Sequence, residues 1–164
     1  MPDLVTHALF VLPAKKLFPK QLVFILIGSI LPDLLGRTLG VFPIDSPLIF
    51  WYQTVIHTPI ALILITYSLS FIFPQRERKT IFTFLLIGIA SHLFLDLFQK
   101  SIGLAYPWFF PLSFSSFQIP LIWPDDTIYL IPILVIINLL IYFYSKYVRN
   151  IWLFGNKKIW DKKR

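Results

Sequence analysis

The residues best suited to chemistry are three histidines and two aspartates that lie within or at the edges of apolar segments. They are His7, Asp33, His57, His92 and Asp96. An ionisable side chain inside a bilayer costs at least a few kcal/mol, so such residues face a protein interior and mark a functional site. Because the chain has no cysteine, three imidazoles and two carboxylates form a ligand set typical of a catalytic zinc or manganese ion. A proton relay or a site for a polar headgroup uses the same groups.

Spacing pairs some of these side chains. His92 and Asp96 are four residues apart, as are Asp3 and His7, so each pair shares one face if the segment is helical. A carboxylate often orients a histidine for structural reasons alone. Spacing therefore leaves both a metal site and a structural pair open.

The segments that carry these residues are apolar. Of 164 residues, 57% are hydrophobic and 14% are charged, whereas a soluble domain is roughly a quarter charged. Hydropathy over windows of about 19 residues predicts segments at 3–18, 21–36, 55–73, 81–98 and 128–144, followed by a basic tail at 145–164. We therefore predict an all-α fold, a polytopic transmembrane helical bundle that forms one integral membrane domain over residues 1–164. It has five membrane segments, or four full spans if the first does not cross.

The basic residues predict the orientation of this bundle, because short loops rich in lysine and arginine stay cytoplasmic. If every segment crosses, all basic residues except Arg37 and Lys100 lie on one side of the membrane. The C-terminus is then cytoplasmic, and the expected location is the inner (cytoplasmic) membrane, with the lipid bilayer as partner. The net charge of +7 thus indicates orientation. Nucleic-acid binding is excluded, since it requires a basic patch on a soluble face.

This topology also predicts where the chemical residues lie. His7, Asp33, His57, His92 and Asp96 all fall at the outer ends of their segments, although the charge rule does not require this. We expect them to meet in one pocket near the outer headgroups, and we call these five residues the His/Asp cluster. The inner halves of the spans are almost entirely apolar, which disfavours a transport or proton pathway.

Two further features concern packing and the outer surface. Gly28 and Ser29 favour close helix packing, and Asn138, in the last span, is expected to form an interhelical hydrogen bond. The connection at 99–127 is rich in aromatic residues, and its prolines prevent a continuous helix. Such residues favour the headgroup level, so the connection is either an aromatic belt on the outer leaflet or a lid or lipid-contacting mouth.

Several motifs occur in a recognisable order: Thr6-His7, G-S-I-L-P-D at 28–33, I-H-T-P at 56–59, S-H-L-F-L-D at 91–96 and Y-P-W-F-F-P at 106–111. In this order they resemble bacterial and archaeal inner-membrane proteins described as predicted membrane-bound metal-dependent hydrolases. That family is loosely similar in motif to zinc-dependent phospholipase C. The resemblance spans residues 6–111 and implies that the His/Asp cluster is the metal site.

Two positions differ from many proteins of that family. Leu35 stands where a second acid follows the aspartate of L-P-D, and Tyr52 stands where a further histidine precedes the I-H-T-P motif. At these positions a second metal ion or a general base would be lost.

We therefore predict a membrane-bound metal-dependent hydrolase that acts on a phosphoester or other ester of a lipid or envelope molecule at the outer face. One divalent ion, zinc or else manganese, would be held by His7, His57 and His92 together with Asp33 or Asp96. The remaining aspartate would orient a ligand or act as the catalytic base. The alternative is a non-enzymatic integral membrane protein whose His/Asp cluster is structural or binds a headgroup. The sequence makes no prediction of oligomeric state.

Overall fold

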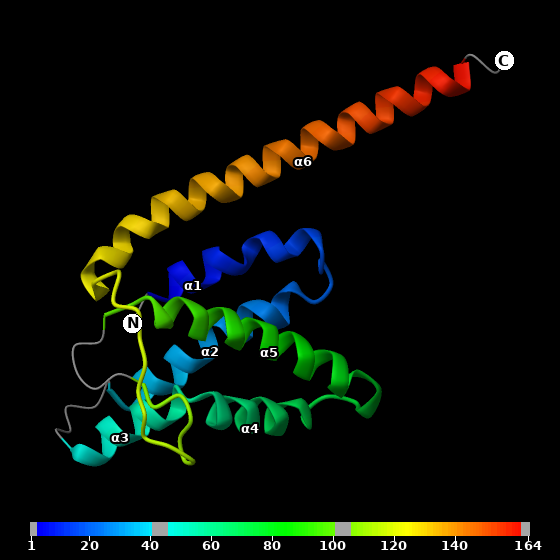
Figure 1. Ribbon diagram of the computed structural model, residues 1–164. Helices are drawn as coiled ribbons and strands as arrows, with labels where there is room; N and C mark the ends of the chain where they lie inside the picture. The colour runs from blue at the N-terminus through cyan, green and yellow to red at the C-terminus, as the bar shows by residue number, and fades with distance from the viewer. Residues whose placement is uncertain (1–2, 41–45, 101–105, 162–164) are drawn as a thin grey trace.

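The computed structural model describes residues 3–40, 46–100 and 106–161, which form helices joined by short connections and one longer irregular segment (Figure 1). The helices, with two 3-10 turns named η, are α1 (Leu4–Val11), η1 (Leu12–Lys16), α2 (Leu22–Gly40), α3 (Pro47–Ile56), α4 (Pro59–Ser70), α5 (Gln75–Leu97), η2 (Pro124–Tyr129) and α6 (Leu130–Asp161). The described residues contain no strand and only two isolated bridges. The predicted all-α fold class is confirmed.

In the described part of the chain, two helices are long and apolar enough to cross a membrane. They are α5 and the stretch Asp125–Val148, which runs from η2 into α6. Helices α3 and α4 give a third candidate if they form a single span bent by 75°. The apolar part of α2, Leu22–Gly36, is shorter than a span. The structure thus gives two candidate membrane-spanning helices within the described residues, and four or five spans are not confirmed.

The segment predicted at 55–73 is not one helix, because α3 ends at Ile56 and α4 begins at Pro59. The Thr58 side chain caps α4 by accepting a hydrogen bond from the Ala61 amide at 3.4 Å. Pro59 stands in the first turn, where its missing N–H removes no intrahelical bond. His57 therefore lies at the C-cap of α3, between the two helices. The predicted segment 3–18 is similarly divided, into α1 and η1.

Helices α2 and α5 make the most extensive helix–helix contact. At their crossing, a Cβ atom on Gly28 would lie 3.1 Å from the Gly88 Cα, and one on Gly88 would lie 2.7 Å from the Ser29 amide nitrogen. Only glycine permits so close an approach of two backbones, which confirms the predicted close packing at Gly28. The crossing lies about one helical turn from Asp33 on α2 and His92 on α5.

Helix α6 lies alongside α1 and its C-terminal part extends beyond the other helices (Figure 1). The Asn138 side chain donates a hydrogen bond to the Leu9 carbonyl at 3.0 Å, which confirms the predicted interhelical bond. Large apolar side chains of α6 such as Leu140 are exposed. Exposed apolar side chains are expected for a helix that faces lipid, because lipid tails are as apolar as the side chains themselves.

The segment at 106–123 folds back over the C-terminal end of α5. The Ile119 amide donates to the Leu97 carbonyl at 2.7 Å, and the Leu121 amide donates to the Phe98 carbonyl at 3.0 Å. These bonds satisfy carbonyls that the end of a helix leaves unpaired. Trp108 packs against a small buried core of Leu62, Ile89 and Leu93, so the segment has an inner side that covers the bundle.

Candidate metal centre

The His/Asp cluster is assembled from four helices. His7 comes from α1, Asp33 from α2, His57 from the C-cap of α3, and His92 and Asp96 from successive turns of α5. All five residues are 0–2% exposed. The structure therefore brings every residue of the predicted pocket together at one buried point.

Asp3 has a different role from the one its spacing suggested. Its carboxylate caps α1 by accepting hydrogen bonds from the Thr6 amide at 2.9 Å and from the Thr6 hydroxyl at 2.7 Å. Partial burial raises the pKa of Asp3, but the hydrogen bonds from Thr6 and nearby amides outweigh it, so the pKa lies below its ordinary value of 3.8. Asp3 thus fixes the start of the helix that carries His7.

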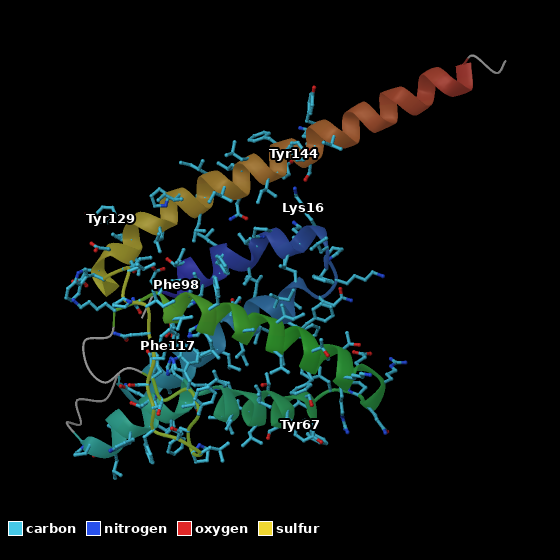
Figure 2. The ribbon with its side chains drawn as sticks, viewed as in Figure 1. Lys16, Tyr67, Phe98, Phe117, Tyr129 and Tyr144 are labelled. Atoms are coloured by element: carbon cyan, nitrogen blue, oxygen red, sulfur yellow. The ribbon has the colours of Figure 1, made fainter. Side chains whose placement is uncertain are left out.

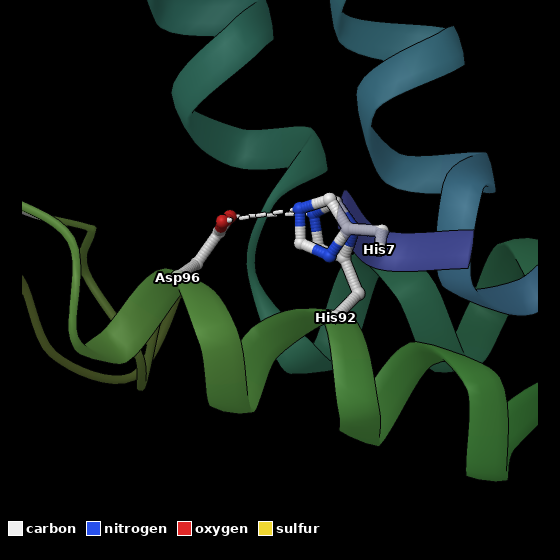
Figure 3. Close-up of side chains that lie close together, drawn as sticks. All are labelled: His7, His92 and Asp96. Carbon is white, nitrogen blue, oxygen red and sulfur yellow. Dashed lines mark ion pairs between the residues drawn. The ribbon is translucent and has the colours of Figure 1, made fainter. Parts of the chain in front are cut away.

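The Nε2 atom of every histidine lies near a carboxylate oxygen. The distance is 3.3 Å between His92 and Asp96, and 3.6 Å between His7 and Asp96 (Figure 3). It is 3.6 Å between His57 and Asp33, and 3.9 Å between His7 and Asp33. The His7 and His92 rings also stack, with centroids 3.9 Å apart. The five side chains thus form one continuous cluster.

Two backbone carbonyls set the orientation of two of the rings. The Nδ1 of His92 is 2.7 Å from the Ser29 carbonyl oxygen, and the Nδ1 of His57 is 2.8 Å from the Gln53 carbonyl oxygen. A carbonyl oxygen only accepts hydrogen bonds, so each Nδ1 carries the proton. In the neutral rings, each Nε2 therefore presents a lone pair to the cluster. Histidine ligands of metal ions are commonly held in this way.

These lone pairs face carboxylate oxygens, which are also acceptors. Two acceptors repel each other unless a proton or a metal ion lies between them. The separations of 3.3–3.9 Å exceed the 2.7–2.9 Å that is roughly usual for a charge-assisted hydrogen bond. They are close to the ~3.4 Å expected between two ligands that are each about 2.1 Å from a tetrahedral metal ion. The donor set and its spacing therefore fit a metal ion.

Hydrogen bonding inside the protein leaves much of the cluster unsatisfied. Both ring nitrogens of His7, the Nε2 atoms of His57 and His92, and both carboxylate oxygens of Asp96 are buried without a hydrogen-bond partner among the described residues. Buried polar atoms without partners are rare and costly in native proteins. A bound cation is one way to satisfy them.

Two groups within the cluster could each hold an ion, and they share one residue. The first is His7, His92 and Asp96, and the second is Asp33, His57 and His92; within each group the ligand atoms lie within 4.8 Å of one another. Because Nδ1 of His92 is bonded to Ser29, only its Nε2 can bind a metal ion. His92 can thus serve one ion, which favours a single metal.

Two further residues lie against the His57 ring. The Tyr106 ring stacks on the His57 ring with centroids 5.3 Å apart, and a Cβ atom on Gly36 would lie 2.7 Å from Cε1 of His57. The carbonyls of Ser29 and Gln53 gave no sequence signal, because every residue has a carbonyl. Tyr106 did give a sequence signal, since it begins the Y-P-W-F-F-P motif.

Leu35 and Tyr52, the two positions at which the motif resemblance is incomplete, are in contact. The Tyr52 hydroxyl donates a hydrogen bond to the Leu35 carbonyl at 3.4 Å. Neither side chain offers the carboxylate or imidazole of a metal ligand. This part of the structure thus adds no ligand to the His/Asp cluster.

A family model described as YdjM inner membrane protein matches residues 3–157, a range that includes the whole His/Asp cluster. No curated protein and no solved structure matches the chain. The matching description names a membrane location and no activity. It confirms the inner-membrane part of the predicted resemblance and shows that the chain belongs to the YdjM inner membrane protein family.

Proposed function

We propose that this protein binds one divalent metal ion, zinc, in the His/Asp cluster and uses it to hydrolyse a phosphoester or other ester of a lipid or envelope molecule. The observation that carries the proposal is the orientation of His57 and His92. Each ring is tied through Nδ1 to a carbonyl, and each directs its Nε2 lone pair at a carboxylate oxygen in a buried site. A cation between these atoms removes the repulsion.

The charge of the cluster also supports a divalent ion. Asp33 and Asp96 carry two negative charges when ionised, and neutral imidazoles add none. Burying such charge without compensation costs several kcal/mol per group, whereas a divalent cation neutralises it. Nitrogen and oxygen ligands without sulfur suit zinc, with manganese as the second choice.

The residues divide into ligands and a base. His57 and His92, held by backbone carbonyls, act as fixed ligands, and His7 completes the set from α1. One of Asp33 and Asp96 binds the ion, and the other takes a proton from water as general base. A divalent ion held there supplies Lewis acidity towards a phosphoryl or carbonyl oxygen and makes water acidic enough to be a nucleophile near neutral pH.

The segment at 106–123 supports a substrate taken from the membrane surface. Phe109, Phe114 and Phe117 on this segment are 61–67% exposed, while Tyr106 stacks on His57. The exposed aromatic side chains suit the lipid headgroup region. The charge rule puts this face outside and the C-terminus in the cytoplasm of a multi-pass protein.

The activity is tested with the full-length protein in detergent, loaded with zinc or treated with a chelator. Hydrolysis of bis(p-nitrophenyl) phosphate and of a fluorogenic phospholipid is measured for the wild type, Asp96→Asn and the matched control Asp125→Asn, whose side chain is exposed on η2. We expect zinc-dependent hydrolysis in the wild type and the control, and a loss of at least about 100-fold in Asp96→Asn. Equal rates with zinc and with chelator would contradict the proposal.

The burial of the cluster favours a second candidate, a structural or headgroup-binding network in a protein that is not an enzyme. The 0–2% exposure of all five residues is typical of a structural site. This candidate predicts that chelation leaves thermal melting unchanged while His57→Ala still destabilises the protein. A melting temperature that falls on chelation, without any hydrolysis, would indicate a structural metal ion.

A further inference from the structure

A cavity lies between η1 and α6 and shares no residue with the His/Asp cluster. Its volume is about 450 Å³, which is within the usual range for small-molecule sites. Its wall includes the charged side chains of Lys15, Lys16 and Lys146 and the apolar side chains of Leu12 and Ile141. The cavity thus combines three positive charges with an apolar surface.

The cavity results from the way in which α6 meets the N-terminal helices. Asn138 ties α6 to α1 at the Leu9 carbonyl. Beyond this point α6 continues straight, while the chain turns at η1 towards α2 (Figure 1). Asn138, Ile141 and Ser145 all line the cavity, and their spacing of three and four residues gives α6 one face towards η1.

Among the described residues, the lysines on this cavity have no acidic partner. Lys16 Nζ donates to the Ile141 carbonyl at 2.5 Å, a carbonyl that also accepts from the Ser145 hydroxyl at 2.9 Å. Figure 2 shows Lys16 in the space between η1 and α6. In the described part of the chain, ion pairs form only within the His/Asp cluster and between Arg76 and Glu77. The positive charges of Lys15, Lys16 and Lys146 are therefore available to a ligand.

We propose that this cavity binds an anionic phospholipid, with its phosphate at Lys15, Lys16 and Lys146 and its acyl chains along Leu12 and Ile141. Basic pockets between membrane helices bind anionic headgroups on the cytoplasmic side, and the charge rule assigns these lysines to that side. The apolar wall favours a lipid over a free anion, which gains nothing from Leu12 and Ile141. The lipid would fill the gap between α6 and the bundle.

Native mass spectrometry of the full-length protein in detergent tests the proposal with phosphatidylglycerol and phosphatidylcholine of identical acyl chains. We expect the wild type to prefer phosphatidylglycerol at least tenfold, since each of the three lysines contributes roughly fivefold when it lies near an anionic headgroup. The triple variant Lys15→Gln, Lys16→Gln, Lys146→Gln keeps the side-chain length and removes the charge. Its preference is expected to fall to about threefold or less.

A matched control removes three charges from the same side of the protein but outside the cavity: Lys20→Gln, Arg76→Gln, Lys79→Gln. This control is expected to keep the wild-type preference. A second cavity variant, Ser145→Trp, fills the space without changing charge and is expected to weaken phosphatidylglycerol binding as well. It tests the site even if the triple variant does not fold.

Three results would overturn the proposal. The first is equal loss of preference in the cavity variants and the control, which would indicate a non-specific charge effect. The second is undiminished preference in both cavity variants. The third is competition by glycerol phosphate at the same concentration as the lipid, which would indicate a site for free phosphate groups. Binding is expected to be the same with and without chelator, so the result is independent of the proposed metal ion.

Discussion

The substitution Gly88→Ala tests whether the crossing of α2 and α5 positions the His/Asp cluster. An added Cβ atom would lie 2.7 Å from the Ser29 amide nitrogen and 2.9 Å from the Gly28 carbonyl carbon. Both neighbours are backbone atoms, so neither can rotate away. Since ordinary contacts between carbon atoms are about 3.5–4.0 Å, α2 must move away from α5 by roughly 1 Å.

The size of the expected effect follows from what this movement breaks. The Ser29 carbonyl accepts a hydrogen bond from His92 Nδ1 at 2.7 Å, and a shift of about 1 Å takes it out of hydrogen-bonding range. Loss of a partner that orients a metal ligand costs about 10–100-fold in metal affinity. We therefore expect zinc to bind about 10–100-fold more weakly to Gly88→Ala.

The assay is competition for zinc against a chromophoric chelator, with the full-length protein in detergent. The control Ala90→Ser adds one heavy atom to an exposed position on α5 and is expected to bind zinc like the wild type. Alanine is a better helix former than glycine by about 1 kcal/mol, so a loss in Gly88→Ala cannot come from α5 itself. Unchanged zinc affinity and melting temperature in Gly88→Ala would show that the crossing of α2 and α5 does not position His92.

Three further substitutions have distinct expected outcomes. Gly36→Ala would place a Cβ atom 2.7 Å from Cε1 of His57. Because the His57 side chain can shift to relieve this contact, we expect little change in melting temperature but weaker zinc binding in the same competition assay. Asp3→Ala removes the cap of α1 and is expected to cost about 1 kcal/mol in the free energy of unfolding. Because the pKa of Asp3 is lowered, the stabilisation by the Asp3 cap is present above about pH 4 and is lost as pH falls through the lower pKa of the folded state. If wild type and Asp3→Ala differed in denaturant midpoint by the same amount at pH 7 and at pH 2, this pH dependence would be contradicted. Asn138→Leu removes the bond to the Leu9 carbonyl and is expected to cost about 0.6 kcal/mol, measured by thermal melting, with zinc affinity unchanged.

The convergence of the His/Asp cluster was predictable, and the physical reason is membrane energetics. Charged loops determine which ends of the segments share a side, and ionisable residues at those ends avoid lipid by facing one another. The roles of individual atoms were not predictable. The orientation of His57 and His92 depends on the carbonyls of Gln53 and Ser29, and these backbone groups leave no trace in the sequence.

The helices, too, were predictable only in part. Helix α5 was predictable because its apolar run is long, whereas the break between α3 and α4 was not, because a hydropathy window averages over the short polar interruption at Thr58. The Thr58-Pro59 pair is nevertheless an N-cap followed by a first-turn proline, which is a local signal of a helix start. Helix α6 continues to Asp161, beyond the span predicted at 128–144.

The metal content of the purified protein decides whether the His/Asp cluster holds an ion. The full-length protein is purified at neutral pH, exchanged into metal-free buffer and measured by inductively coupled plasma mass spectrometry, beside the double variant His57→Ala, His92→Ala and the control Asp125→Asn. We expect one zinc ion per chain in the wild type and the control, because His92 can serve one ion only, and none in the double variant. A folded wild type without stoichiometric metal, or a double variant that retains it, would show that the His/Asp cluster is not a zinc site.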